Sequence, residues 1–212
     1  MNFSGEQLRE GLLKACLAEH ERTVRSVGSE DRITEYFRGI GWGWALDEHC
    51  PDGVYDDATR RRLGLAGPLN WCGIGIGWVG VHLLGNHLVA GQCVPVRLDR
   101  DIASTIMPST ARIYYAERWA QVEPDRPATV AASIIEPGDI LCVKTGPRKS
   151  YGDHYAVARL EPSGGRVETV EFNAAGGLGD GAQGRGVVMR DRRIDDVAVA
   201  YRLDESHFER TQ

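Results

Sequence analysis

The chain contains 212 residues, of which 42% are hydrophobic and 26% charged, and its formal net charge at pH 7 is -5. This composition is typical of a soluble globular protein, and the length predicts one domain with its own core. The acidic balance argues against a nucleic-acid partner, because no basic stripe is available to neutralise phosphates. No apolar run reaches the length of a membrane span, and the N-terminus lacks the pattern of a secretory signal peptide.

The first part of the chain predicts helices. Residues 4–26 place leucines at helical spacing behind an expected N-cap, Ser4. Residues 30–40 predict a second helix with its apolar side chains on one face. Residues 41–58 are aromatic and loop-like, and a short basic helix is expected over 57–64.

A third helix, over residues 72–85, is expected to be buried on most sides. Bulky side chains such as Trp78 alternate with glycines in this segment. Each glycine costs a helix about 1 kcal/mol relative to alanine, so the neighbours must pack closely to offset the cost. Residues 109–121 predict a further amphipathic helix.

The second half of the chain predicts antiparallel strands and therefore an α+β fold. The expected strands are 139–144, 154–160, 166–172, 186–190 and 197–203. A turn at Pro162-Ser163-Gly164-Gly165 joins the second and third of these as a hairpin. The glycine-rich segment 174–186 predicts a mobile loop between two strands.

The five cysteines are odd in number and irregularly spaced, which excludes a simple disulfide framework. Cys16 falls on an amphipathic helix and Cys142 in a strand, where both are expected to act as small buried hydrophobes. Cys72 differs, because it stands at the start of the apolar helix.

Cys72 combines with two later segments into a nucleophilic constellation. A helix N-terminus carries partial positive charge, which favours a thiolate over a thiol. His154 heads a strand, from which its imidazole can accept the thiol proton and later protonate a leaving amine. Glu171 and Asn173 are two candidates to hold the imidazole, and their i, i+2 spacing predicts that both side chains share one face of a strand.

A purely structural interpretation competes with this one. Cys72 would then be a core cysteine, and His154 a strand-edge residue satisfied by Asp153. The combined context of Trp-Cys at a helix start, Pro-Gly-Asp before a strand and Glu-x-Asn after a hairpin favours catalysis.

Four segments of the chain resemble successive motifs of one family. NWCGIGIGWV, EPGDILCV, DHYAVARL and VEFNAAGG are similar to the nucleophile, "PGDI", base and "ExN" segments of the CHAP and NlpC/P60 papain-like peptidoglycan hydrolases. ITEYFRGIGW and IYYAERWAQVEP are also similar to segments in phage and bacterial members of this superfamily. The resemblance spans about residues 30–175, although only the four short motifs are specific.

The resemblance implies the fold, the activity and the roles of four residues. Cys72 matches the nucleophile and His154 the base, while Glu171 and Asn173 match the positions that orient the histidine and support the site. The implied fold is papain-like: N-terminal helices, then a nucleophile helix packed on an antiparallel sheet. The implied reaction is cleavage of an amide bond in peptidoglycan, by an amidase or an endopeptidase.

The expected organisation is one domain over residues 1–212, with an N-terminal helical part of about 1–65 and a catalytic core of about 66–205. The chain departs from the family pattern at three points. Glycines follow the cysteine where the family has larger residues, and Tyr155-Ala156 replaces the usual valine-glycine. An insertion is also expected around 86–108, where it would narrow or gate the groove.

Four further residues are candidates for contacts with the substrate. Trp42 and Trp44 alternate in a glycine-rich stretch and are as well suited to a groove as to the core. Trp71 and Asp153 stand directly before the nucleophile and the base.

No cofactor and no metal are expected. Gly75-Ile-Gly77-Trp-Val-Gly80 fits a dinucleotide fingerprint, but no strand precedes it. His82, His87 and Cys93 do not have the spacing of a standard zinc site.

The substrate and the biological setting stay open at this point. Peptidoglycan or a peptide is the expected substrate, and a phage lysis or virion enzyme or a secreted antibacterial effector the expected setting. Synthesis in the cytoplasm without a signal peptide, followed by non-standard delivery to the periplasm or cell wall, would suit either. An effector would also imply an immunity protein. The alternatives are a cysteine acyl-transfer enzyme acting on a protein or small molecule, and a non-catalytic phage or binding module.

Overall fold

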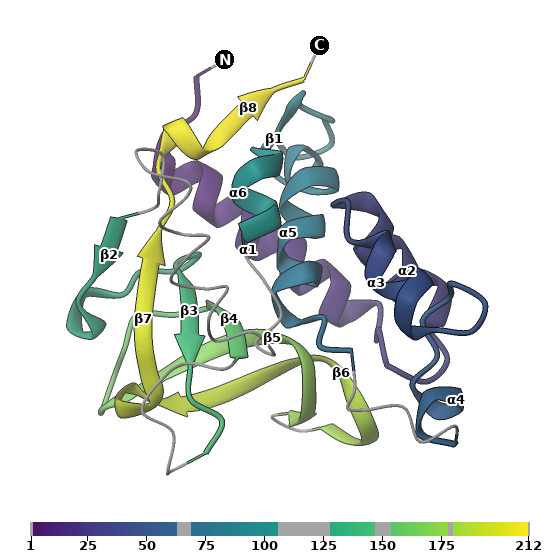
Figure 1. Cartoon of the computed structure of the whole chain (residues 1–212). Helices are drawn as coiled ribbons and strands as arrows, with labels where there is room; N and C mark the ends of the chain where they lie inside the picture. Colours follow the sequence, from purple (N-terminus) through teal and green to yellow (C-terminus); the bar gives the residue numbers. More distant parts are fainter. Residues whose placement is uncertain (1, 63–68, 106–127, 147–153, 178–179, 212) are drawn as a thin grey trace.

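The computed structural model describes residues 2–62, 69–105, 128–146, 154–177 and 180–211. Its fold is mixed α+β, with the helices on one side and a six-stranded sheet on the other (Figure 1). The helices are α1 (Gly5–Glu21), α2 (Glu30–Gly39), α3 (Gly43–His49), α4 (Asp57–Arg62), α5 (Cys72–His82) and α6 (Arg100–Thr105). The short 3-10 helices are η1 (Leu84–Asn86), η2 (Ala132–Ile134), η3 (Ile194–Asp196) and η4 (Glu205–His207).

Six strands form one antiparallel sheet in the order β2-β7-β3-β4-β5-β6. These strands are β2 (Ala128–Val130), β3 (Ile140–Val143), β4 (His154–Ala158), β5 (Arg166–Gly177), β6 (Asp180–Arg193) and β7 (Val197–Arg202). Two short strands, β1 (Val96–Leu98) and β8 (Phe208–Arg210), pair separately and bring the C-terminal end of the chain beside the segment that follows η1.

The two faces of the sheet belong to different apolar clusters. Tyr155, Val157, Val170 and Phe172 join the main core with the helices, whereas Ala156 and Val167 lie in a smaller cluster on the other face. This division follows from the alternation of side chains along each strand. Helix α5 packs on β4 and β5 and also contacts α1, α2 and α6, so the main core lies around it.

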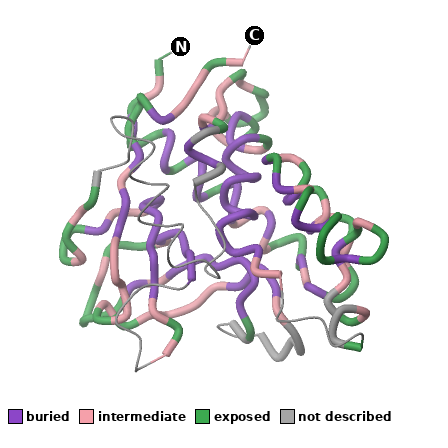
Figure 2. The backbone as a smooth tube through the Cα atoms, in the orientation of Figure 1, coloured by how far each residue is buried: buried purple, intermediate pink, exposed green. Residues whose placement is uncertain are grey.

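Helix α5 is buried from Cys72 to Val81, as Figure 2 shows by its continuous buried trace. Its glycines permit this burial. A Cβ on Gly75 would lie 2.2 Å from the ring of Phe172, and one on Gly77 would lie 2.7 Å from the carbonyl oxygen of Ala103. The prediction of a buried helix, with glycines that let neighbouring elements pack closely against it, is therefore confirmed.

The predicted helices at the N-terminus are also confirmed. Ser4 caps α1 by accepting a hydrogen bond from the Gln7 backbone, and the Gln7 side chain accepts one in return, which forms a capping box. In α2, Ile33, Tyr36 and Phe37 are buried together.

Three segments differ from the predictions. Residues 41–58 are not all loop, because α3 forms within them and buries Ala45 and Leu46. Residues 174–186 do not form a loop throughout, since β5 and β6 continue pairing as far as Gly177 and Asp180. Within 86–108, the structure places β1 and α6. The helix expected over 109–121 lies outside the described residues.

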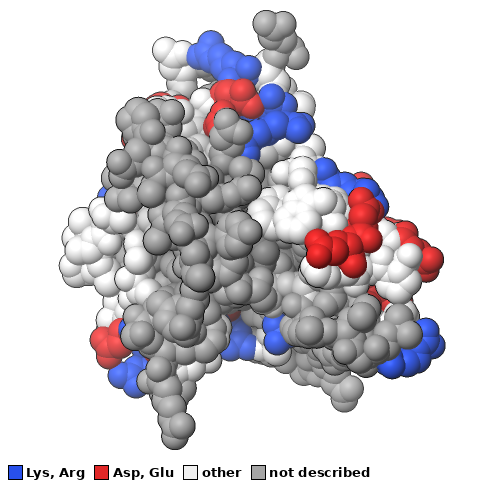
Figure 3. All heavy atoms as spheres, viewed as in Figure 1, with Lys and Arg blue, Asp and Glu red and all other residues white. Residues whose placement is uncertain are grey.

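Basic and acidic side chains are interspersed on the face of the molecule seen in Figure 3, where the described residues form no continuous basic stripe. Within the described ranges, no helix combines the length and apolar character needed to cross a membrane.

Candidate active site

Cys72 is the first residue of α5, at a helix start that has no side-chain cap. Trp71 takes the cap position, and its carbonyl accepts the first helical hydrogen bond, from Gly75 at 2.9 Å. The Cys72 sulfur accepts hydrogen bonds from the backbone N–H groups of Gly73 and Tyr155. These donors and the partial positive charge of the helix start stabilise a thiolate.

His154 begins β4 and is hydrogen-bonded to Cys72 on one side and to Glu171 on the other. Its Nε2 lies 3.1 Å from Oε2 of Glu171, which leaves Nδ1 for the sulfur. Both neighbours are fully buried, and His154 is 7% exposed. The structure therefore brings three of the predicted site residues into one hydrogen-bonded row.

The environment of the row favours charged forms of the thiol and the imidazole. Burial alone would raise the pKa of Cys72, but the charge of His154 and the hydrogen bonds to the sulfur outweigh it and lower that pKa. Burial works against the His154 imidazolium, yet Cys72 and Glu171 together raise the pKa of His154 to about 9. These opposite shifts favour a thiolate–imidazolium pair.

Glu171 is held by hydrogen bonds from two side chains besides His154. Arg192 donates to both of its carboxylate oxygens, Nε to Oε1 and a terminal nitrogen to Oε2, each at 2.6 Å. The hydroxyl of Thr169 donates to Oε1 at 2.8 Å. Burial opposes the charge of the carboxylate, but the hydrogen bonds and charges of Arg192 and His154 hold the pKa of Glu171 far below its usual range.

Arg192 was not among the predicted site residues. Its only signal in the sequence is the alternation of Arg190 and Arg192 in the basic run at the end of β6. Which arginine meets Glu171 depends on the register between β5 and β6, in which Thr169 pairs with Arg190 and Glu171 with Val188. That register cannot be derived from the sequence alone.

Asn173 contacts a different part of the site from the one predicted. Its backbone has a φ of 55°, in the left-handed region, at an irregularity in the pairing of β5 with β6. The strand alternation that would place it on the same face as Glu171 is broken there. Instead, its Nδ2 donates to Oδ1 of Asn70 at 3.1 Å, which ties β5 to the segment that leads into Cys72.

The tryptophans separate into buried and exposed positions. Trp71 is fully buried, with its ring centroid 5.9 Å from that of Tyr36 and 6.2 Å from that of Phe172. Trp42 is 9% exposed and lies 5.1 Å from Trp44, which is 54% exposed. Packing explains Trp71, while Trp44 has surface available for a ligand. Asp153 lies outside the described residues.

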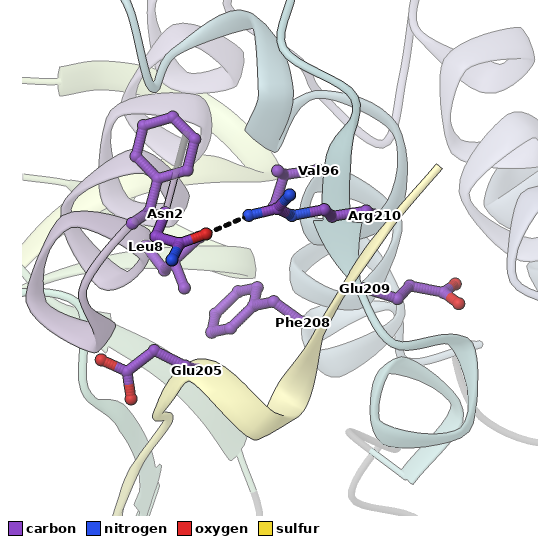
Figure 4. A pocket seen from close by; sticks show the side chains of 8 residues that line it. Asn2, Leu8, Val96, Glu205, Phe208, Glu209 and Arg210 are labelled. Atoms are coloured by element: carbon purple, nitrogen blue, oxygen red, sulfur yellow. Dashed lines mark hydrogen bonds between the residues drawn. The ribbon is translucent and has the colours of Figure 1, made fainter. Parts of the chain in front are cut away.

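Cys72 is 0% exposed in this structure. A pocket of about 300 Å³ lies elsewhere, where the two ends of the chain meet, and contains none of the predicted site residues (Figure 4). Its lining includes Phe3, Val96 and Phe208.

Among the described residues, no three His, Cys, Asp or Glu side chains gather in a way that would hold a metal ion. No protein-family model, curated protein or solved structure matches this chain.

Proposed function

We propose that this protein is a cysteine hydrolase that cleaves an amide bond through a thioester intermediate. The observation that carries the proposal is the buried row Cys72–His154–Glu171, in which each neighbour stabilises the charged form of the next. Core cysteines and histidines do not need this arrangement, whereas nucleophilic catalysis does.

The proposed cycle starts from the thiolate–imidazolium pair. The Cys72 sulfur attacks the carbonyl carbon of the amide, and the oxyanion accepts hydrogen bonds from backbone N–H groups at the start of α5. His154 gives its proton to the leaving amine as the C–N bond breaks, which leaves a thioester on Cys72. His154 then removes a proton from water, and the hydroxide releases the acid and restores the thiolate.

Glu171 and Arg192 contribute without touching the substrate. Glu171 fixes the imidazole through Nε2 and stabilises its positive charge. Arg192 keeps the carboxylate ionised and limits its rotation, because both oxygens are held at once.

We infer that the fold is papain-like and that the substrate is peptidoglycan. The support is the order of the motifs NWCGIGIGWV, EPGDILCV, DHYAVARL and VEFNAAGG, together with the packing of α5 on β4 and β5. A phage lysis enzyme or an antibacterial effector delivered to the cell wall, the latter with an immunity protein as partner, is the setting that we propose.

The test is incubation of the purified protein with Gram-negative and Gram-positive sacculi, with Cys72→Ala as the control and mass spectrometry of the released products. New amine termini or freed stem peptides that disappear in the variant would support the proposal and identify the bond. If sacculi stay intact while Cys72 is hyper-reactive toward iodoacetamide, the wall substrate is wrong and the enzyme acts on another acyl compound. If Cys72 is no more reactive than the other cysteines, catalysis itself is wrong.

A further inference from the structure

The segment that leads into the nucleophile is held by strand β5 through two successive contacts. Oδ1 of Asn70 accepts a hydrogen bond from Nδ2 of Asn173 at 3.1 Å. The ring of the next residue, Trp71, meets that of Phe172 edge-on, with the ring planes at 89°. The two residues before Cys72 are therefore held by two neighbouring residues of β5.

The two contacts have different explanations. Trp71 and Phe172 belong to the main apolar core, so burial alone accounts for their contact. Asn173 is only 2% exposed, and burial of an amide is unfavourable unless it is hydrogen-bonded. Its Oδ1 is buried and has no partner in the described part of the chain. Packing therefore does not account for an asparagine at this position.

The backbone of Asn173 is also in an uncommon conformation. Among the described residues, only Asn173 and Thr23 carry a side chain at positive φ. Asparagine tolerates the left-handed region better than most residues, but the conformation still costs free energy and is found where the surroundings impose it. In a regular strand, Asn173 would share the face of Glu171. The irregularity between Glu171 and Ala174 allows the amide to reach Asn70 instead.

The same strand holds the histidine of the site. Glu171, two residues before Asn173, lies 3.1 Å from Nε2 of His154, and His154 is hydrogen-bonded to Cys72. Strand β5 thus fixes the imidazole through Glu171 and the cysteine segment through Asn173. Because a hydrogen bond weakens steeply as its length and angle change, the contact between sulfur and imidazole depends on both attachments.

We propose that Asn173 is a positioning residue for Cys72, which acts through Asn70 and keeps the sulfur within hydrogen-bond reach of His154. This role differs from the one that the family resemblance implies, in which Asn173 orients the histidine. It rests on the cysteine hydrolase proposed above, because it concerns the same thiolate–imidazolium pair.

The test measures the thiolate directly and requires no substrate. The rate at which iodoacetamide alkylates Cys72 is measured at pH 6 and pH 10 by peptide mass spectrometry. The ratio of the rates at pH 6 and pH 10 follows the fraction of thiolate at pH 6, and access to the sulfur cancels. Asn173→Gly tolerates the positive φ and lacks the amide, and Asn70→Ala lacks the acceptor. We expect each substitution to lower the ratio by about tenfold, because the bond between imidazole and sulfur is weakened.

The double variant tests whether the two asparagines act through their mutual bond. If they do, Asn70→Ala with Asn173→Gly should lower the ratio by about tenfold, as each single substitution does, and not by about a hundredfold. Independent, multiplied effects would overturn the proposal. A lowered ratio in Asn173→Gly with an unchanged ratio in Asn70→Ala would also overturn it, since Asn173 would then act on the imidazole.

Thr34→Val is the control for a loss of stability alone. It removes a hydroxyl of α2 that accepts a hydrogen bond from the backbone N–H of Tyr55 at 2.9 Å. Urea denaturation should show lower stability, while the alkylation ratio should equal that of the wild type. The same behaviour in Asn70→Ala would show that the asparagine pair is only structural. If Asn173→Gly does not fold, Asn70→Ala alone decides, because Asn70 is only half-buried.

The wild type separates this role from the hydrolase proposal. Its ratio for Cys72 should exceed that for Cys93, which is exposed. A ratio no higher than that of Cys93 would refute the hydrolase proposal and the positioning role together. A high ratio that neither asparagine substitution lowers would refute the positioning role and leave the hydrolase proposal intact.

Discussion

Cys72, His154, Glu171 and Arg192 form a row in which favoured negative and positive charges alternate. Each charge is buried at a cost that its neighbours offset, so no member can be removed without changing the pKa of the next. This coupling makes the pH dependence of the row a direct test of its geometry.

The first prediction concerns the reactivity of Cys72. With its pKa lowered, Cys72 should react with iodoacetamide well below the ordinary thiol pKa of about 8.5, ahead of the other cysteines. His154→Ala removes the opposing charge and leaves burial, so the pKa of Cys72 should rise and the preference should disappear. Hydrolysis should decline on the alkaline side with a pKa of about 9, as His154 loses its proton. An unchanged alkylation profile in His154→Ala would contradict the ion pair.

The second prediction concerns the carboxylate. Glu171→Gln should reduce kcat by about a hundredfold, because the imidazolium loses its stabilising charge. It should also move the alkaline limit of activity to lower pH, since Glu171 contributes to the raised pKa of His154. Glu168→Gln is the matched control: it lies on the same strand, its side chain is 37% exposed, and it pairs with Arg159. Equal effects of the two substitutions would argue against the assigned role of Glu171.

At the scale of elements, the position of α5 depends on its glycines. Gly77 meets the backbone of α6, at Ala103, and a carbonyl oxygen of a packed helix cannot rotate away as a side chain can. The close contact therefore fixes α5, and with it the sulfur of Cys72, against its neighbours.

The third prediction is that Gly77→Ala destabilises the protein by about 1–3 kcal/mol, as overpacking does, despite the higher helix propensity of alanine. Gly43→Ala is the control, because a Cβ at that helical position would come no closer than 3.2 Å to any atom, and that atom is a terminal nitrogen of the half-exposed Arg38 side chain. Its effect should stay within about 0.5 kcal/mol. Urea denaturation measures the free energy of unfolding of both variants. An equally small change in both would show that α5 and α6 can move apart at little cost, and would contradict the prediction.

The sequence predicted those elements that carry a strong local signal. The buried helix at 72–85 and strands near 139–144 and 154–160 are confirmed, since apolar runs, glycines and turn residues mark them. Helices α3 and α6 were missed because they contain only seven and six residues, which is too few for the helical repeat of apolar side chains to show. The pairing beyond Phe172 was missed because glycines in a strand have the composition of a loop.

The candidate site was predictable only in part, for similar reasons. The positions of Cys72 and His154 follow from a helix start and a strand start. The sequence did not show whether Glu171 or Asn173 contacts His154. The answer depends on the left-handed backbone conformation of Asn173, which no spacing rule indicates. The contact of Arg192 with Glu171 depends on the register between β5 and β6, which the sequence does not give.

At the scale of the whole molecule, a buried ion pair joins the N-terminal helices to the core. Glu19 of α1 is fully buried and accepts hydrogen bonds from Arg32 at 3.0 and 2.7 Å and from the hydroxyl of Tyr36. Burial opposes its charge, but these contacts lower the pKa of Glu19. The Arg32 guanidinium also lies 4.1 Å from the ring of Trp78 in α5. One network thus connects α1, α2 and α5.

The fourth prediction follows from this network. Arg32→Ala leaves the carboxylate of Glu19 buried without its main partner, and should lower the free energy of unfolding by about 3 kcal/mol. Because the folded-state pKa of Glu19 lies below its unfolded value, the pair contributes stability above the unfolded pKa of about 4.3 and loses it as pH falls through the folded value. The wild type should therefore lose more stability than Arg32→Ala on acidification.

Arg38→Ala is the matched control, because Arg38 lies on the same helix and pairs at the surface with Asp47. Its effect should be below about 1 kcal/mol and should depend on salt. Thermal unfolding between pH 7 and pH 3 measures all three proteins. Since α2 contacts α5, loss of the network should also slow alkylation of Cys72 in Arg32→Ala but not in Arg38→Ala. Unchanged alkylation in both would show that α5 holds Cys72 in place without the N-terminal helices.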